Sequence, residues 1–341
     1  MIGKSHHNWL INYFKKHDFL PFDVFMSQML YAPEIGYYMR PDSPFGCQGD
    51  FITGPMMTPC FGDMVVHTLL NQADFDNWLE WGPGAGHLAV QVIKCLHAMG
   101  RLPKQYYCIE LNPYLREKQK AYFEDSLGPL AKVITWVQNV PNGFKGFVLA
   151  HEILDALPAK RVGYHKGQYV EHGFSWQDGL TDVIYDVDDV TSKILSQLKI
   201  PKIEGYTTEW RPTQIEDWLS CHDVADDIVM MLFDYGYERL DYYHPDRRKG
   251  TLRVYSQHQE CSSVKDHLGQ KDISVSVDWS SVGEALIKGG WQPLSLQNQA
   301  QWFGQYGDRV GRQIDVSGLN TLIHTSMGEV MKVALALKKT S

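Results

Sequence analysis

The sequence lacks the features that mark several classes of protein. It has six cysteines in 341 residues, and none of them form a C-x-x-C pair. In a chain of this length, scattered cysteines indicate buried thiols in a reducing compartment rather than a disulfide framework, and they do not have the spacing of a zinc site. We therefore expect no structural disulfide and no bound metal.

Positive charge is also scarce. The chain has 32 Lys and Arg and 40 Asp and Glu, which gives a formal net charge of -8. Binding to nucleic acid or to an anionic membrane surface depends on clustered basic residues. The densest basic cluster, at 247–249, is short. The charge therefore predicts neither a nucleic acid nor a membrane surface as partner.

Long apolar runs are missing as well. No stretch approaches the length of a membrane span. The first 20 residues place Lys and His among helically spaced apolar residues, and no small-residue cleavage site follows. We interpret this segment as a structural helix and expect a cytoplasmic location. The hydrophobic content of 44% is enough for a buried core, in one large α/β domain with insertions or in two domains.

Glycine is concentrated in one stretch, NWLEWGPGAGHLAV at 77–90. It predicts a short strand, a turn containing Gly82, Gly84 and Gly86, and the start of a helix. Such a turn lets a ligand approach the backbone and directs the free N–H groups of the helix N-terminus at it. The alternative is a turn that only packs the helix against the strand.

The details of this stretch argue against a dinucleotide. The dinucleotide fingerprint is G-x-G-x-x-G, whereas the spacing here is G-x-G-x-G. The carboxylate of Glu80, two residues before Gly82, would repel a pyrophosphate. It suits a ligand with positive charge, such as the ammonium and sulfonium groups of S-adenosylmethionine (SAM).

A second acid follows the next predicted strand, at 106–109. Glu110 lies 24 residues past Gly86, where the acid of a Rossmann-like sheet accepts hydrogen bonds from ribose hydroxyls. A solvated acid at a strand end is the alternative. Because strand, loop and helix alternate from 78 to 158, we predict an α/β fold with a mainly parallel, doubly wound sheet and ligands at the carboxyl ends of its strands.

Two further segments contain candidate polar residues. The loop at 32–59 is long for a compact domain, and its GDFIT segment places Asp50 and Thr53 among apolar neighbours. A turn with a local Asp cap would also explain that segment. HEILD at 151–155 is not the zinc motif H-E-x-x-H, because Asp155 replaces the second histidine. It supplies Glu152 and Asp155, which would share one face if the turn is helical.

The rest of the chain predicts supporting elements. Residues 5–31 read as amphipathic helices that form a cap, and we place 1–73 in this cap and 74–341 in the main domain, with a β-rich insertion at about 160–225. We expect a β-hairpin over 162–184, a buried strand at 228–233, further strands at 251–255 and 273–277, and a C-terminal helix over 322–338.

Taken together, the motifs resemble the MidA-like methyltransferases. The resemblance spans nearly the whole chain and rests on GYY at 36–38, FGxxGDFIT at 45–53, ExGPGxG at 80–86, Glu110 with LRxxQ at 115–119, HEILDALP at 151–158, DYGY at 234–237, GTLxxYxxH at 250–258 and GxxDIxxxVDW at 269–279. It implies a seven-strand, class I SAM-dependent methyltransferase fold. Mitochondrial relatives act in assembly of respiratory complex I and methylate an arginine of a subunit, so a protein arginine is the implied acceptor. The chain departs from the family pattern at Met56, where the family has an acid, and at His151, where it has Asn.

The resemblance and the residue patterns give one expected site. The expected cofactor residues are Thr53, Glu80, Gly82, Gly84, Gly86, Glu110, Leu111, Val137, Gln138 and His151. The expected catalytic residues, which orient the acceptor, are Asp50, Glu152 and Asp155. Methyl transfer needs alignment of donor and acceptor more than acid or base strength, and paired carboxylates suit a guanidinium, which is always charged.

Other functions stay open at this point. The chain could bind SAM and act as an assembly factor without turnover, or it could methylate a small molecule. A partner protein that supplies the arginine is the implied substrate, and a second copy of the chain is an additional candidate partner.

Overall fold

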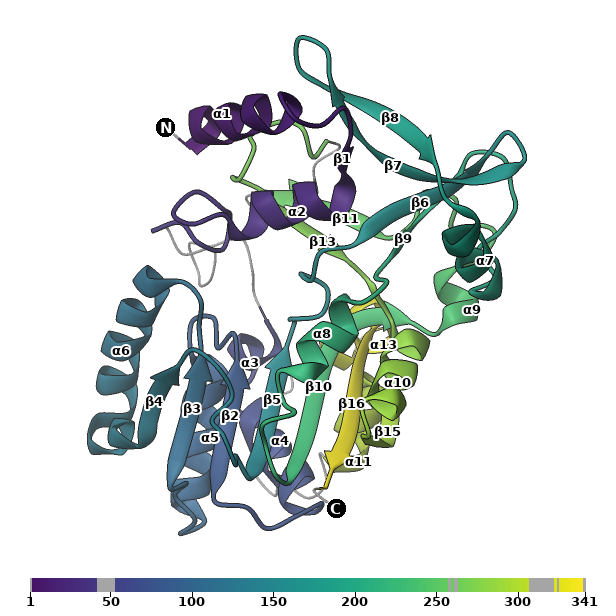
Figure 1. Ribbon diagram of the computed structural model, residues 1–341. Helices are drawn as coiled ribbons and strands as arrows, with labels where there is room; N and C mark the ends of the chain where they lie inside the picture. Colours follow the sequence, from purple (N-terminus) through teal and green to yellow (C-terminus); the bar gives the residue numbers. More distant parts are fainter. Residues whose placement is uncertain are drawn as a thin grey trace. The chain divides into compact units, whose positions relative to one another are not determined.

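The computed structural model describes residues 2–41, 53–256, 259–260, 263–306, 322–323 and 325–339. The chain forms two compact units (Figure 1). The first comprises Met1–Arg40, Leu154–Ile215 and Gly236–Val282, and the second comprises Pro41–Ile153, Glu216–Tyr235 and Gly283–Ser341. These boundaries differ from the predicted division at residue 73, because the N-terminal helices belong to one unit with two later segments.

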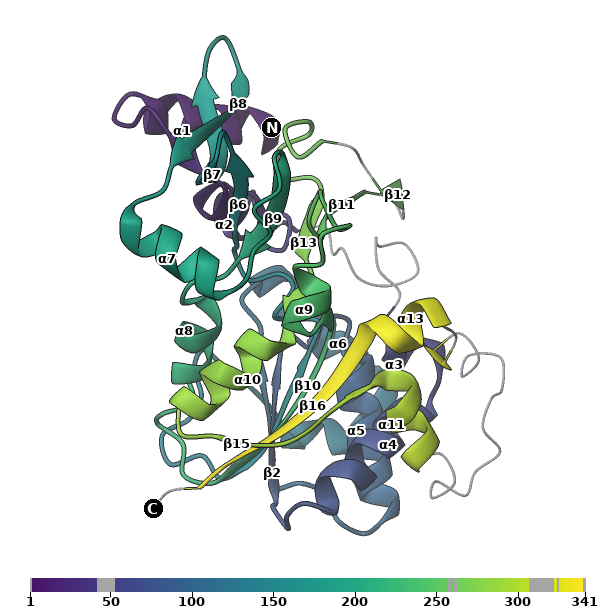
Figure 2. The ribbon, with the colours of Figure 1, turned by 90° about the vertical axis from the view of Figure 1, so that its right-hand side faces the viewer.

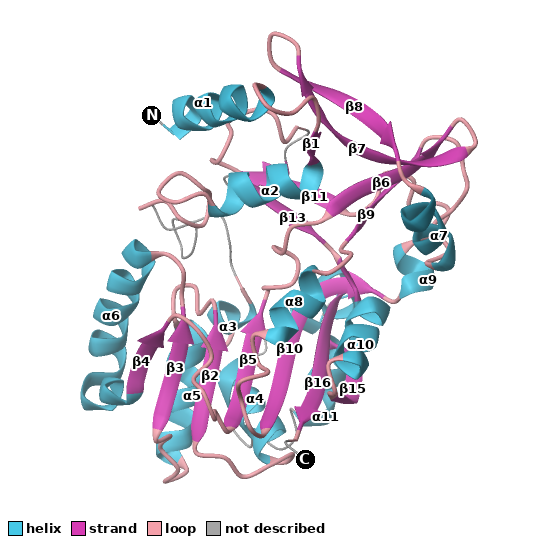
Figure 3. Cartoon of the chain, viewed as in Figure 1, coloured by secondary structure: helices cyan, strands magenta, loops and turns pink. Residues whose placement is uncertain are grey.

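The second unit is built on a mainly parallel sheet with the strand order β15-β16-β10-β5-β2-β3-β4. Strands β10, β5, β2, β3 and β4 are parallel to one another, whereas β16 is antiparallel to both β10 and β15. The strands are β2 (Asn77–Trp81), β3 (Gln105–Ile109), β4 (Ile134–Val137), β5 (Gly146–His151), β10 (Ile228–Tyr237), β15 (Gln292–Asn298) and β16 (Met331–Lys338). Figure 3 shows these strands alternating with helices, which confirms the predicted α/β class.

Helices cover both faces of this sheet. Figure 2 shows α4, α5 and α11 on one face and α8 and α10 on the other. The helices of this unit are α3 (Gly54–Met57), α4 (Cys60–Leu70), α5 (His87–Ala98), α6 (Pro113–Leu127), a 3-10 helix (Gly128–Val133), α11 (Gln299–Tyr306) and α13 (Thr325–Val330); α8 (Gln214–Ser220) and α10 (Trp279–Lys288) begin in the first unit. Trp78 and Phe147 of the sheet pack in one core with Phe61, Ile93 and Trp302. Within the described ranges, no helix is both long and apolar enough to span a membrane.

The strand order creates a switch point at the centre of the sheet. From β2 the chain runs outward through β3 to β4 and then returns to β5, on the opposite side of β2. Trp81 pairs with Ala150, so β2 and β5 end almost level with each other. In sheets of this kind, ligands bind in the crevice outside the carboxyl ends of the strands at the switch point. That crevice lies next to the glycine turn and to His151.

The first unit is mainly antiparallel. Its larger sheet has the order β1-β7-β6-β9, with β8 also paired to β7, and its smaller sheet has the order β12-β11-β13. The elements are α1 (Ile2–Phe14), β1 (Leu20–Pro21), α2 (Phe22–Tyr31), β6 (Lys160–His165), β7 (Gln168–Trp176), β8 (Leu180–Asp186), α7 (Asp189–Gln197), β9 (Tyr206–Trp210), α9 (Arg239–Tyr242), β11 (Leu252–Ser256), β12 (Gln259–Glu260), β13 (Asp272–Val275) and β14 (Val277–Asp278). The predicted hairpin over 162–184 is therefore part of a three-stranded meander.

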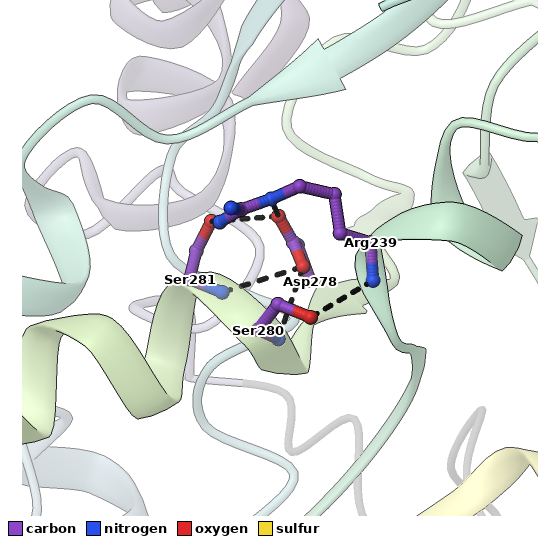
Figure 4. A network of polar contacts seen from close by, with 4 residues as sticks. All are labelled: Arg239, Asp278, Ser280 and Ser281. Carbon is purple, nitrogen blue, oxygen red and sulfur yellow. Dashed lines mark hydrogen bonds and ion pairs between the residues drawn. The ribbon is translucent and has the colours of Figure 1, made fainter. Parts of the chain in front are cut away.

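A polar network in the first unit fixes the start of α10 (Figure 4). Asp278 accepts hydrogen bonds from the backbone N–H groups of Ser280 and Ser281, at 3.1 and 3.3 Å, and its Oδ2 accepts from the Ser281 hydroxyl at 2.6 Å. The guanidinium Nε of Arg239 lies 3.5 Å from Asp278 Oδ2. Asp278 is thus an N-cap, which satisfies the unpaired donors of the helix and ties it to α9.

The predicted C-terminal helix over 322–338 is wrong in its second half. Residues 322–323 and Thr325–Val330 (α13) are helical, but Met331–Lys338 forms β16. This strand pairs with β10 on one side and with β15 on the other, and most of its residues are buried. A short continuous apolar run that is buried on both faces looks alike in a helix and in a central strand, so periodicity alone could not separate them.

Candidate functional site

The glycine turn joins β2 to α5. Gly82, Gly84 and Gly86 have φ angles of +56°, +54° and +89°, which lie in the left-handed region where side chains are strained. The Gly82 N–H donates to the carbonyl of Ile109 at 2.8 Å, and the Gly86 N–H donates to the carbonyl of Pro83 at 2.7 Å. These hydrogen bonds fix the turn, and its left-handed backbone favours glycine at all three positions.

Two of these glycines also allow close packing. A Cβ on Gly82 would lie 2.6 Å from Cδ1 of Ile153, and a Cβ on Gly86 would lie 2.4 Å from Cε1 of Phe123. The packing role that the sequence left open is thus real for Gly82 and Gly86. It does not exclude a ligand, because the same turn still presents the N-terminus of α5 at the switch point.

Glu80 lies beneath the turn and is only 2% exposed. Its Oε2 accepts a hydrogen bond of 2.6 Å from the hydroxyl of Tyr106 on the neighbouring strand β3. Burial raises the pKa of Glu80 to about 7, and the hydrogen bond from Tyr106 opposes part of this shift. A buried carboxylate with an unfavourable charge favours a nearby cation, so the cationic ligand expected at Glu80 stays a prediction.

Glu110 follows β3 and retains free acceptor capacity. Its Oε1 accepts from the backbone N–H of Asn112 at 2.9 Å, and its Oε2 accepts from the side-chain amide of Gln119 at 3.1 Å. The backbone N–H of Leu111 also bonds to this carboxylate, so only part of its roughly four lone-pair positions remains for a ribose hydroxyl. Burial raises the pKa of Glu110, and these hydrogen bonds oppose the shift. The geometry fits the predicted ribose contact.

Three predicted cofactor residues lie at or beyond the ends of β3 and β4. Leu111 is 58% exposed. Val137, the last residue of β4, is half-buried, and Gln138 is exposed. Apolar surface next to a ribose-binding acid suits the flat face of an adenine, so these positions stay a prediction for the adenine end of the ligand.

Gln119 is a site residue that sequence reasoning missed. Its amide nitrogen donates to the carbonyl of Gly84 at 2.8 Å as well as to Glu110, and its amide oxygen accepts from the indole of Trp136 at 2.8 Å. It therefore connects the glycine turn to the ribose-binding acid. The signal was present, because Gln119 stands in the apolar stripe of α6 between Leu115 and Phe123, at spacings of four residues.

His151 and Glu152 lie at the carboxyl end of β5. Glu152 has a φ of +55°, and its N–H donates to the carbonyl of Phe233 at 2.8 Å. The segment from 152 to 157 forms bends and turns. The condition under which Glu152 and Asp155 would share one face, a helical turn, is therefore not met, because the left-handed residue and the hydrogen bond to the β10 carbonyl break any helix here.

The remaining expected residues lie in three settings. Thr53 precedes α3, whose Pro55 carbonyl accepts from the side-chain amide of Gln91 on α5 at 2.6 Å, so α3 is held against α5. Asp50 lies outside the described residues. Asp155 belongs to the first unit, whereas Glu152 belongs to the second.

Within the first unit, the Arg211 side chain binds the backbone at Asp155 and at neighbouring segments. Its guanidinium donates to the carbonyls of Asp155 (2.9 Å), Leu157 (3.0 Å), Val275 (2.9 Å) and Ser276 (3.1 Å). Burial raises the pKa of the Asp155 carboxyl to about 6, and the charge of Arg211 opposes the shift. Sequence reasoning did not find Arg211, because its partners are backbone groups from two distant segments.

The second unit thus has the architecture of a nucleoside-binding α/β methyltransferase: a strand, a left-handed glycine turn and a helix, with an acid after the next strand. A model of the family described as "Putative S-adenosyl-L-methionine-dependent methyltransferase" matches residues 61–297, and the chain belongs to this family. The motif resemblance is thereby confirmed.

Curated relatives and solved structures agree with this family. The chain is 30% identical over 302 residues to "Protein arginine methyltransferase NDUFAF7 homolog, mitochondrial" of Drosophila melanogaster, covering 77% of this chain and 65% of that protein. It is 25% identical over 287 residues to the Rattus norvegicus NDUFAF7 protein, covering 75% and 64%. The chain thus spans less than two thirds of the length of these relatives. A Burkholderia thailandensis superfamily member, crystallised with S-adenosyl-homocysteine, has the same fold, with a TM-score of 0.90 at 24% identity over 99% of this chain and 92% of that one.

The comparisons contradict the expected cytoplasmic location. The relatives from fly, rat and frog all carry the word mitochondrial in their names. The prediction rested on the absence of an apolar signal segment and a cleavage site. That absence does not distinguish between these two locations.

Proposed function

We propose that this protein is a SAM-dependent methyltransferase whose acceptor is an arginine side chain of a partner protein. The observation that carries the proposal is the position of the glycine turn and of the His151–Glu152 pair at the two strand ends that flank the switch point. A methyl donor bound along the glycine turn would meet an acceptor held at the His151–Glu152 pair. The names of the curated relatives support arginine as the acceptor.

The residues present fit SAM. Buried Glu80 favours the positive charge of its amino-acid part, the N-terminus of α5 can meet its carboxylate, and Glu110 keeps acceptor capacity for its ribose. A pyrophosphate would instead face the buried carboxylate of Glu80. Glu80 therefore favours SAM over a dinucleotide.

When bound, SAM supplies a methyl group on a sulfonium: the S–C bond breaks with its electron pair on sulfur, a C–N bond forms, and the acceptor nitrogen gives up one proton. The chain's contribution is positioning. The rigid glycine turn fixes one end of the ligand site, and Gln119 holds that turn and Glu110 at a fixed separation. Glu152 and Asp155 are each, taken singly, our candidates to bind the guanidinium, since charge-assisted hydrogen bonds to a carboxylate are strong and directional.

Two measurements test the proposal. Calorimetric titration should show binding of SAM and S-adenosyl-homocysteine and none of NAD; NAD binding without SAM binding would overturn it. Mass spectrometry of arginine methylation in cells with and without the gene should then reveal the acceptor. If cells without the gene lack a methylated small molecule but keep all methylated arginines, a small-molecule methyltransferase is favoured. SAM binding without any methylated product would favour an assembly factor. A role in respiratory complex assembly stays a prediction from the family resemblance.

A further inference from the structure

The imidazole of His151 has a buried nitrogen without a partner. Its side chain is 8% exposed, and Nε2 makes no hydrogen bond in the described part of the chain. The ring packs against Phe61, at 5.5 Å between centroids, and against Phe233, at 5.3 Å. Buried polar atoms normally find a partner, so an unpaired one at a strand end calls for an explanation.

The position of His151 places this nitrogen at the switch point. His151 is the last residue of β5, one residue beyond Ala150, which pairs with Trp81 just before the glycine turn. Two residues later, Ile153 packs against Gly82 so closely that a Cβ there would clash. The strand end that carries His151 therefore lies directly beside the glycine turn.

The surroundings of the ring leave Nε2 as a hydrogen-bond acceptor. Nδ1 lies 3.5 Å from Oε1 of Glu152, so the carboxylate favours a proton on Nδ1. Burial lowers the pKa of His151 to about 4, so the ring is neutral near pH 7. A neutral ring does not repel a cation, and since no donor among the described residues reaches Nε2, its lone pair is available to a donor that comes with a ligand.

We infer that His151 Nε2 accepts a hydrogen bond from the N–H of the acceptor nitrogen, and that His151 positions the acceptor rather than the cofactor. This rests on the proposed function and revises our assignment of His151 to the cofactor site. As the C–N bond forms and the S–C electron pair stays on sulfur, the proton of that N–H moves along this hydrogen bond and then passes to solvent. Glu152, next in the chain, supplies the negative charge that a guanidinium requires.

A binding experiment tests the contact without turnover. Protein labelled with 15N at histidine is saturated with S-adenosyl-homocysteine and titrated with N-acetyl-arginine amide, and the His151 signals are assigned by their loss in His151→Asn. The arginine probe should shift the Nε2 resonance, whereas the matched N-acetyl-citrulline amide, which has the same shape but no charge, should shift it far less. A resonance that moves on addition of S-adenosyl-homocysteine and ignores the arginine probe would return His151 to the cofactor site.

Kinetic variants give a second, independent test. His151→Phe should bind S-adenosyl-homocysteine within twofold of the wild type but transfer methyl groups at least tenfold more slowly. His151→Asn should recover part of the rate, because its amide oxygen can accept the same hydrogen bond. His222→Asn is the matched control, since His222 is a buried neutral imidazole in the same unit whose Nε2 already accepts from Trp81 at 3.0 Å.

The outcomes separate this inference from the proposed function. A tenfold loss of S-adenosyl-homocysteine affinity in His151→Phe, or unchanged transfer by that variant, would overturn the inference alone. A wild-type protein that binds no S-adenosyl-homocysteine would overturn the proposed function and the inference with it. Melting temperatures of all three variants show whether a loss of rate reflects folding, and rates are compared per folded molecule.

Discussion

The hydroxyl of Tyr106 on β3 donates a 2.6 Å hydrogen bond to the carboxylate of Glu80 on β2, the strand that leads into the glycine turn. Both side chains are fully or almost fully buried. A single neutral donor compensates only part of the cost of removing a carboxylate from water. The ionised form of Glu80 is therefore destabilised in the free protein, and a bound cation would stabilise it.

This burial makes stability depend on pH. The pKa of Glu80 is about 7 in the folded chain, against 4.5 for an ordinary Glu. The folded state binds the proton more tightly than the unfolded state, so protonated Glu80 contributes to the free energy of unfolding. This contribution, roughly 3 kcal/mol, is fully present below pH 4.5 and is lost as the pH rises through about 7. In Glu80→Gln, whose amide oxygen can still accept from Tyr106, this loss should disappear. Urea unfolding of both proteins at pH 5 and pH 8 measures it, and equal pH dependence would show that Glu80 is not the titrating group.

Gly84 offers a sharper test of the ligand site. Gly84→Val should abolish S-adenosyl-homocysteine binding in calorimetry while the chain stays folded, because a branched side chain would occupy the space of the ligand. Gly100→Val is the matched control: Gly100 has a φ of +70°, and a Cβ there meets nothing within 4 Å. Both variants carry the strain of a left-handed residue, about 1–3 kcal/mol. Normal binding by Gly84→Val would mean that the turn does not contact the ligand.

The link between Gln119 and Glu110 predicts graded effects on affinity. Glu110→Ala should weaken SAM binding by ~1.5–3 kcal/mol, the usual value of a hydrogen bond to a charged group. Gln119→Leu fills a similar volume but removes the bonds to Gly84, Glu110 and Trp136. It should weaken SAM binding by a smaller amount and also lower the melting temperature. Calorimetry and thermal unfolding of both variants measure this, and a Gln119→Leu protein with wild-type affinity would limit Gln119 to a structural role.

The site residues that sequence reasoning predicted depend on local order. The glycine spacing, Glu80 before it and Glu110 after the next strand are near one another along the chain. Gln119 appeared only as part of the LRxxQ motif, without a role, and Arg211 escaped because its partners are backbone groups of distant segments. The strand β16 escaped because only its pairing with β10 distinguishes it from a helix. What was missed was therefore fixed by tertiary contacts rather than by local pattern.

The two carboxylates predicted to hold the acceptor can be tested separately, because they belong to different units of the chain. Glu152→Gln and Asp155→Asn should each leave SAM affinity within a few fold and reduce transfer to an arginine-bearing protein by roughly 10- to 100-fold, the value of one lost charge-assisted hydrogen bond. Both variants replace a carboxylate with a neutral amide of the same shape, so they remove the charge without changing the volume of the side chain.

For Asp155, the pH profile separates a role in the acceptor site from a structural one. Its pKa of about 6 means that the carboxylate that a guanidinium needs is present only above that pH. Transfer by the wild type should therefore fall as the pH drops through about 6, and Asp155→Asn should lose this dependence. If Asp155 is only a cap for the turn at 155–157, Asp155→Asn should instead lose ~1 kcal/mol of stability with unchanged transfer per folded molecule. Unchanged transfer in both variants would remove Glu152 and Asp155 from the acceptor site.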